Sequence, residues 1–166
     1  MNYINSTSYS RVNAVNYAFK YALEPNPNYK YFLVYSTNGG DCTNFISQCL
    51  RAGGAPIVTS GRNQWWYNNR SWSVSWSTAG SLYWYLKIND KDKLYGIKGT
   101  EVNSISMMEP GDIIFYQNAN GRMQHSAIIT SYYENYPLVS QHTPNVLNIP
   151  YKKDWSVKMH FLKIHL

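Results

Sequence analysis

The chain has 166 residues, a length typical of one globular domain that buries its core without metals or disulfides. Its net charge is +6, but only 14% of residues are charged and no basic block or nucleic-acid-binding motif occurs. The charge therefore favours an anionic partner other than nucleic acid. We expect a single domain over residues 1–166, with residues 1–9 as a flexible N-terminal segment anchored by Tyr3 and Tyr9.

No apolar run approaches the roughly 18 residues that a membrane-spanning helix needs, and the first residues lack the basic and apolar regions of a signal peptide. We therefore expect no membrane span. The chain contains two cysteines, and their Cys-x6-Cys spacing on a helix is not a zinc pattern. The sequence thus predicts neither a cofactor nor a metal.

Apolar residues recur at helical spacing over residues 11–23, and Pro25 ends this predicted helix. A further amphipathic helix is predicted from Ala79 to about residue 89. The tryptophan-rich stretch 55–77 that precedes it is expected to be irregular, and residues 87–103 are expected to form an exposed connection.

The most informative helix is predicted to begin at Cys42, after Asp41, and to stop at Gly53 in a left-handed conformation. Cys42 lies in the first turn, where the helix dipole and unpaired N–H groups favour a thiolate. Cys49 lies two turns further along the same apolar stripe, about 10 Å from Cys42, which is too far for a disulfide. We expect two free thiols, Cys42 reactive and Cys49 packed in the core; the alternative is that both only pack.

The second half of the chain has the alternation typical of strands. Residues 112–117 and 123–130 are predicted to pair as an antiparallel hairpin, followed by strands at 138–143 and 157–166, the last with a bulge at 161–162. Helices followed by an antiparallel sheet indicate an α+β fold, with the N-terminal helices packed on the sheet.

A thiolate nucleophile needs a base within hydrogen-bond reach and a group that orients the base. His125 is the best candidate base because it opens a strand whose inward face continues toward the core. His142 is the expected orienter of His125, with Gln141 as the competitor, since only one of these neighbours can point inward. His160 and His165 are expected to be solvated.

Four segments together resemble the putative amidase domain family of the papain-like superfamily, related to the NlpC-type and CHAP cell-wall hydrolases. They are NGGDCTNFISQ at 38–48, EPGDII at 109–114, HSAI at 125–128 and SQHTPN at 140–145. The resemblance implies a papain-like fold with Cys42 as nucleophile, His125 as general base and His142 as the third polar group. It also implies that Asp41 contacts the substrate, as the aspartate beside the cysteine does in NlpC-type relatives.

Five of the six tryptophans cluster near the middle of the chain, where Trp65 and Trp66 are candidates for stacking on a sugar ring; the alternative is a satellite core. An amide-cleaving thiol, sugar-stacking aromatics and a preference for an anionic polymer together point to peptidoglycan. The leading hypothesis is a monomeric N-acetylmuramoyl-L-alanine amidase that acts in the cell wall or outside the cell, as an excised domain or after release by lysis.

Three alternatives stay open at this point. The first is a stem-peptide endopeptidase. The second is a papain-like deamidase or transglutaminase-like enzyme that acts on protein amides. The third is a catalytically silent wall-binding module in which Cys42 belongs to the core.

Overall fold

The computed structural model describes residues 8–35 and 38–166, so most of the predicted flexible segment lies outside the described residues. Tyr9, at the edge of that segment, is anchored as expected, because its hydroxyl donates to the carbonyl of Gly111 at 2.9 Å. None of the helices in these ranges combines the length and the apolar character that crossing a membrane requires.

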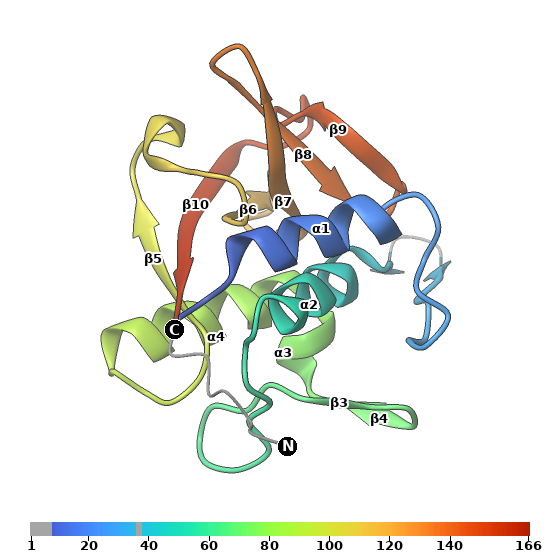
Figure 1. The fold of residues 1–166 in the computed structure, drawn as a ribbon, viewed down its shortest axis with the longest axis vertical. Helices are drawn as coiled ribbons and strands as arrows, with labels where there is room; N and C mark the ends of the chain where they lie inside the picture. The colour runs from blue at the N-terminus through green and yellow to red at the C-terminus, as the bar shows by residue number, and fades with distance from the viewer. Residues whose placement is uncertain (1–7, 36–37) are drawn as a thin grey trace.

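The molecule is an α+β fold in which the helices pack against one face of a curved antiparallel sheet (Figure 1). The sheet has six strands in the order β5-β10-β6-β7-β8-β9. Their bounds are β5 Lys98–Val102, β6 Ile113–Gln117, β7 Met123–Tyr133, β8 Tyr136–Gln141, β9 Val146–Pro150 and β10 Lys158–His165. Two small hairpins lie outside this sheet: β1 Val34–Tyr35 with β2 Asn38–Gly39, and β3 Tyr67–Asn68 with β4 Ser71–Trp72.

The helices follow the predicted apolar periodicity. They are α1 Arg11–Tyr21, α2 Cys42–Ala52, α3 Val74–Ser77 and α4 Ala79–Lys91, with a short 3-10 turn, η1, at Ile105–Met107. Ser10 caps α1 by accepting from the N–H of Asn13. At the end of α2 the prediction was wrong by one residue: Gly53 has φ of −72°, and Gly54, with φ of 101°, is the left-handed residue.

The two faces of the sheet bury two separate clusters. Ile113, Phe115 and Ile128 face the helices, whereas Ile114, Ala127 and Val139 belong to a second cluster on the opposite face. Because successive side chains of a strand point to opposite faces, the parity of a residue decides which cluster it joins.

Several predictions for the second half need correction. Residues 98–102 form the edge strand β5, and residues 146–150 form β9, although no strand was predicted at either place. The stretch 55–77 contains the β3–β4 hairpin and α3. The strand β10 has no bulge at 161–162, because its pairing with both neighbours continues without a shift in register. The apparent change of phase arises because both faces of β10 carry apolar side chains.

Candidate active site

Cys42 is the first residue of α2, and its side chain is 9% exposed at the point where the helix meets β7. Its sulfur lies 3.7 Å from the hydroxyl of Thr43, which in turn lies 3.2 Å from the hydroxyl of Ser126 on β7. Burial alone would raise the pKa of the Cys42 thiol. The positive charge of His125 and hydrogen bonds from His125 and Thr43 outweigh burial, so that the pKa is lowered to about 7.

Cys49 provides the internal comparison. Both cysteines are free thiols, as predicted, and Cys49 is fully buried among the apolar side chains of the first cluster. Burial raises the pKa of this thiol well above its ordinary value, and no charged partner offsets that cost in the part of the chain that the structure describes. Of the two cysteines, only Cys42 is electrostatically prepared to become a thiolate.

His125 lies on β7 opposite Tyr116, in the last regular pair with β6 before the strand becomes irregular. The register of β6 against β7 shifts between Tyr116 and Gln117, so that Gln124 is an extra residue on β7. This bulge places Met123 against the helices, and the rings of His125 and Tyr116 lie 5.6 Å apart. The predicted inward face of His125 therefore belongs to the second cluster, and not to the core that α2 packs against.

The two ring nitrogens of His125 differ. Nε2 is buried and has no hydrogen-bond partner within residues 8–35 and 38–166. Because Nε2 is buried away from any partner, Nδ1 is the nitrogen that can serve the Cys42 thiol, whose pKa His125 lowers. A hydrogen-bond acceptor for Nε2 would fix the orientation of the His125 ring.

Gln141 supplies a matching buried acceptor. Its Oε1 atom is the other side-chain atom near this site that is buried without a partner among the described residues. On β8, Gln141 follows Val139 by two residues and so shares its face, and Val139 lies opposite Ile129 on β7. His125 and Gln141 therefore lie on the same face of neighbouring strands, diagonally related across the pair.

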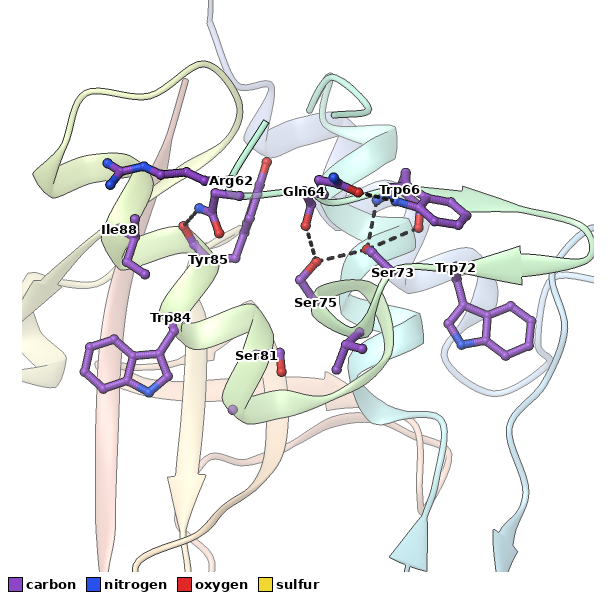
Figure 2. Close-up of a pocket in the computed structure, with 13 residues that line it drawn as sticks. Arg62, Gln64, Trp66, Trp72, Ser73, Ser75, Ser81, Trp84, Tyr85 and Ile88 are labelled. Carbon is purple, nitrogen blue, oxygen red and sulfur yellow. Dashed lines mark hydrogen bonds between the residues drawn. The ribbon is translucent and has the colours of Figure 1, made fainter. Parts of the chain in front are cut away.

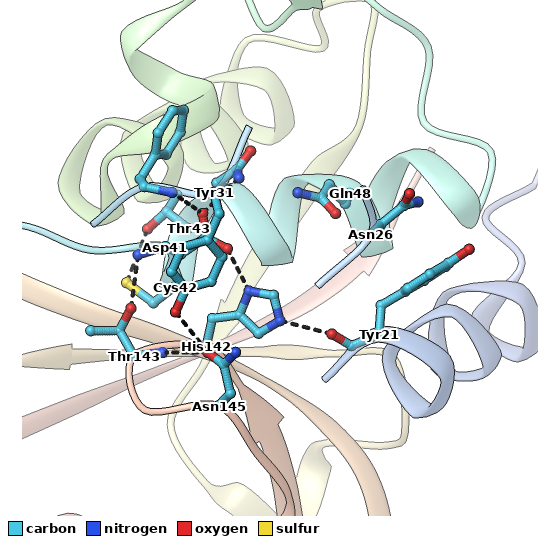
Figure 3. A network of polar contacts seen from close by, with 12 residues as sticks. Tyr21, Asn26, Tyr31, Asp41, Cys42, Thr43, Gln48, His142, Thr143 and Asn145 are labelled. Carbon is cyan, nitrogen blue, oxygen red and sulfur yellow. Dashed lines mark hydrogen bonds and ion pairs between the residues drawn. The ribbon is translucent and has the colours of Figure 1, made fainter. Parts of the chain in front are cut away.

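His142 does not lie with His125, contrary to the predicted orienting role. Its Nδ1 bonds the carboxylate of Asp41, and its Nε2 bonds the carbonyl of Tyr21 at 2.8 Å (Figure 3). Its ring stacks on Phe45 of α2, with centroids 4.1 Å apart, on the helix side of the sheet. Both ring nitrogens of His142 therefore have partners within the fold.

Asp41 is likewise built into the protein and does not face a substrate. It is 1% exposed, and besides His142 its carboxylate accepts from the backbone N–H of Phe32 and from the side chain of Asn44, each at 2.8 Å. Its own N–H donates to Thr143 at 2.8 Å, a close approach that requires Gly40 because a Cβ there would lie 3.2 Å from Thr143. The expected substrate contact is therefore not available to Asp41 in this structure.

The two tryptophans predicted to stack on a sugar separate. Trp65 is fully buried, and its Nε1 donates to the hydroxyl of Ser47 at 3.1 Å, so that it belongs to the core. Trp66 is half-buried and lines an open groove together with Trp72 and Trp84 (Figure 2).

His160 and His165 also separate. His160, predicted to be solvated, is 8% exposed and bonds Glu101 at 2.7 Å and Gln117 at 3.0 Å. His165 keeps 43% of its side chain exposed and lies 3.1 Å from the hydroxyl of Thr100.

Two residues beside the thiol gave no signal in the sequence. Lys153, in the loop after β9, is half-buried, with its amine 5.0 Å from the centre of the Tyr116 ring. Burial lowers the pKa of Lys153 and the negative charge of Cys42 opposes that shift, which places the two groups within electrostatic reach. Trp155, in the same loop, lies edge-on to the ring of His125 at 6.3 Å. A lone lysine or tryptophan in an irregular loop has no periodicity that would mark it.

Comparison with known proteins gives a family and two relatives. A family model described as "Putative amidase domain" matches residues 8–164. The uncharacterized protein YhbB of Bacillus subtilis (strain 168) is 40% identical over 139 residues, covering 81% of this chain and 42% of YhbB. The uncharacterized protein YjcM of the same strain is 37% identical over 151 residues, covering 86% of this chain and 32% of YjcM. The chain thus spans less than half the length of each relative, and no solved structure matches it.

Proposed function

Because this chain belongs to the putative amidase domain family, whose model covers residues 8–164, we propose that it is a cysteine-dependent hydrolase that cleaves an amide bond of peptidoglycan. The observation that carries the proposal is the pairing of Cys42 with His125, which lowers the pKa of a buried thiol to about 7. A cysteine that only packed would resemble Cys49, whose pKa is raised.

We place the chain in the papain-like class of this chemistry. A nucleophilic thiol at the start of a buried helix, facing a histidine from an antiparallel sheet, is the arrangement that the resemblance of the sequence implies. Within that arrangement we assign the orienting role to Gln141 and not to His142. The Nε2–H of His125 would donate to Oε1 of Gln141, satisfying the two buried polar atoms that lack partners among the described residues.

The first half of the reaction forms an acyl-enzyme. The Cys42 thiolate attacks the amide carbonyl carbon, and the negative charge moves to the carbonyl oxygen. The N–H groups in the first turn of α2 would donate to that oxygen, and the helix dipole has the sign that stabilises it. His125, protonated, gives its proton to the leaving nitrogen, the C–N bond breaks and an amine departs from the thioester.

Water completes the cycle. His125, now neutral, accepts a proton from a water molecule as that water attacks the thioester, and Cys42 leaves as a thiolate. The product is a carboxylic acid, and His125 is again protonated. Lys153 contributes a second positive charge near the sulfur, which favours the thiolate before each attack.

The substrate proposal rests on three properties. The net charge of +6 favours an anionic polymer, the reaction requires an amide, and the tryptophan-lined groove offers aromatic faces to an extended ligand. Peptidoglycan and its attached anionic polymers combine these properties, and we propose that the protein acts at the cell wall. The bond we favour joins the lactyl group of the glycan to the first alanine of the stem.

Digestion of purified peptidoglycan, followed by labelling of the new amino termini, tests the proposal. We expect wild-type protein and Cys49→Ala to release alanine termini, Cys42→Ala to release none, and chelators to have no effect. A diamino acid as the new terminus would replace the amidase assignment with a stem-peptide endopeptidase. Equal product from wild type and Cys42→Ala, or loss of activity in chelator that zinc restores, would overturn the thiol mechanism.

A further inference from the structure

A groove with a volume of about 570 Å³ lies on the side of the molecule built from the β3–β4 hairpin, α3 and the first turns of α4 (Figure 2). This volume is in the range of sites that hold a small ligand or part of a polymer. The mechanism above does not use any of the residues that line it. Its aromatic lining consists of three tryptophans, Trp66, Trp72 and Trp84, together with Tyr85.

The tryptophans are held in place while part of each ring stays accessible. Trp84 is 58% exposed on α4, and its ring packs against Tyr83 with centroids 5.2 Å apart. The Nε1 of Trp66 donates to the side-chain oxygen of Gln64 at 3.2 Å. The ring of Trp72 packs on Phe32, with centroids 4.7 Å apart. Rigid aromatic surfaces bind at a low entropic cost, because little side-chain freedom is lost.

Between the tryptophans the groove is polar but nearly uncharged. Ser73 and Ser75 lie 2.9 Å apart, and both hydroxyls belong to a set of hydrogen bonds with the chain around Gln64 and Trp66 (Figure 2). Arg62 is the charged residue in the lining, and it forms an ion pair with Asp92. Aromatic faces above hydroxyl and amide groups, with little free charge, match a neutral sugar, whose C–H faces stack while its hydroxyl and acetamido groups form hydrogen bonds.

The groove borders the Cys42 site on two sides. At one end, Trp72 packs on Phe32, whose N–H donates to the carboxylate of Asp41, the residue before Cys42. Along the floor, a Cβ at Gly80 would lie 3.8 Å from the side chain of Met123, which is two residues before His125. These contacts connect two lining residues, Trp72 and Gly80, with the chain next to Cys42 and His125, although neither Cys42 nor His125 lines the groove.

We propose that this groove binds the glycan strand of peptidoglycan through its N-acetylated amino sugars, with rings against Trp66 and Trp84. This inference rests on the proposed function for the identity of the polymer. It adds that the enzyme holds its substrate by the sugar and not only by the stem peptide.

Binding and hydrolysis are measured separately to test the groove. The probe is a β-1,4-linked oligomer of N-acetylglucosamine, which carries no peptide, titrated into the Cys42→Ala protein and followed by tryptophan fluorescence and calorimetry. We expect saturable binding that Trp84→Ala and Trp66→Ala, made in the same background, each weaken by about tenfold. The matched control is Tyr133→Ala, which removes an aromatic that is 71% exposed on the β7–β8 hairpin and should leave binding unchanged.

The possible failures are distinguishable. If wild-type protein hydrolyses peptidoglycan but the oligomer does not bind, or binds equally after Trp84→Ala and Trp66→Ala, the groove proposal is wrong and the proposed function stands. If the oligomer binds through the tryptophans but peptidoglycan is not cut, the groove stands and the hydrolase proposal falls. Circular dichroism of each variant, together with thermal unfolding, establishes that a loss of binding is not a loss of fold.

Discussion

His125 and His142 lie on opposite faces of the same sheet, and each contacts the start of α2. His142 bonds Asp41 and the carbonyl of Tyr21, so that both ring nitrogens have partners. His125 bonds the Cys42 thiol, while its Nε2 has no partner in the described part of the chain. A histidine with both nitrogens satisfied is held in place by the fold, whereas one with an open nitrogen beside a thiol can still exchange protons. The comparison assigns stability to His142 and chemistry to His125.

The largest effect on activity should come from changes at Cys42 and His125. Cys42→Ala and His125→Ala should each lower kcat/KM on peptidoglycan by at least about 10³-fold, because the nucleophile and its base act as one unit. Their thermal unfolding should change little compared with this loss. Initial rates and melting curves of the same preparations provide the check. A His125→Ala protein with near wild-type rates would remove His125 from the mechanism.

The next-largest effect should come from His142, and it should appear as a lower free energy of unfolding. His142→Ala removes the imidazole from the buried carboxylate of Asp41, which then keeps only the donors Phe32 and Asn44, and breaking a buried pair in this way costs up to about 3–5 kcal/mol in free energy of unfolding. Urea unfolding measures that loss, and the protein that remains folded should keep its activity per folded molecule. A His142→Ala protein of normal stability without activity would restore the orienting role predicted from the sequence.

Gln141→Ala should have an intermediate effect confined to catalysis. A hydrogen bond to a charged group contributes about 1.5–3 kcal/mol, so kcat should fall by about 10- to 100-fold with little change in KM. Because Gln141 acts through His125, the pH dependence of Cys42 alkylation should also change in this variant. Gln141→Asn, with a shorter amide, should restore part of the rate. If the alanine variant matched wild type in both rate and pH profile, Gln141 would not orient His125.

Lys153→Met should give the smallest effect. Removing a cation near the sulfur disfavours the thiolate, so the pKa of Cys42 should rise, by less than about one unit because His125 remains. The matched control is Lys152→Met, which removes the same charge from the exposed neighbouring position. The pH dependence of alkylation in both variants measures the difference. An equal shift in the two variants would mean that Lys153 acts only through the net charge of the protein.

The sequence predicted the helices and strands in which buried apolar residues recur with a regular spacing. The helix from Cys42 to Ala52 has one apolar stripe, and the 112–117 and 123–130 strands flank an evident turn, so these elements were placed correctly. The edge strand β5, with sequence KGTEV, lacks alternation, and β9 contains Asn148 at a φ of 53° and ends at a proline. Neither strand has a pattern that separates it from a loop.

The sequence predicted that Cys42 and His125 act on each other, and the structure has His125 lower the pKa of Cys42, but the residues around this pair were not predictable. The choice between Gln141 and His142 depends on which of two successive residues faces which side, and a shift of one residue reverses the answer. The same uncertainty separated buried Trp65 from Trp66. The bulge at Gln124, next to His125, changes the face that Met123 occupies, and it arises from pairing with β6, which the local sequence does not record.

The most direct measurement is the rate at which iodoacetamide alkylates each cysteine as a function of pH, with mass spectrometry to assign the site. A lowered thiol pKa means that the thiolate forms at lower pH, so Cys42 labelling should rise with pH and reach half its maximum near pH 7. Cys49, whose pKa is raised by burial, should stay unlabelled across that range. In His125→Ala the Cys42 midpoint should move up to or above the ordinary value for cysteine, about 8.5, because burial of the thiol is then no longer offset by His125. Slow and equal labelling of both cysteines, or a Cys42 midpoint that His125→Ala leaves unchanged, would contradict the account.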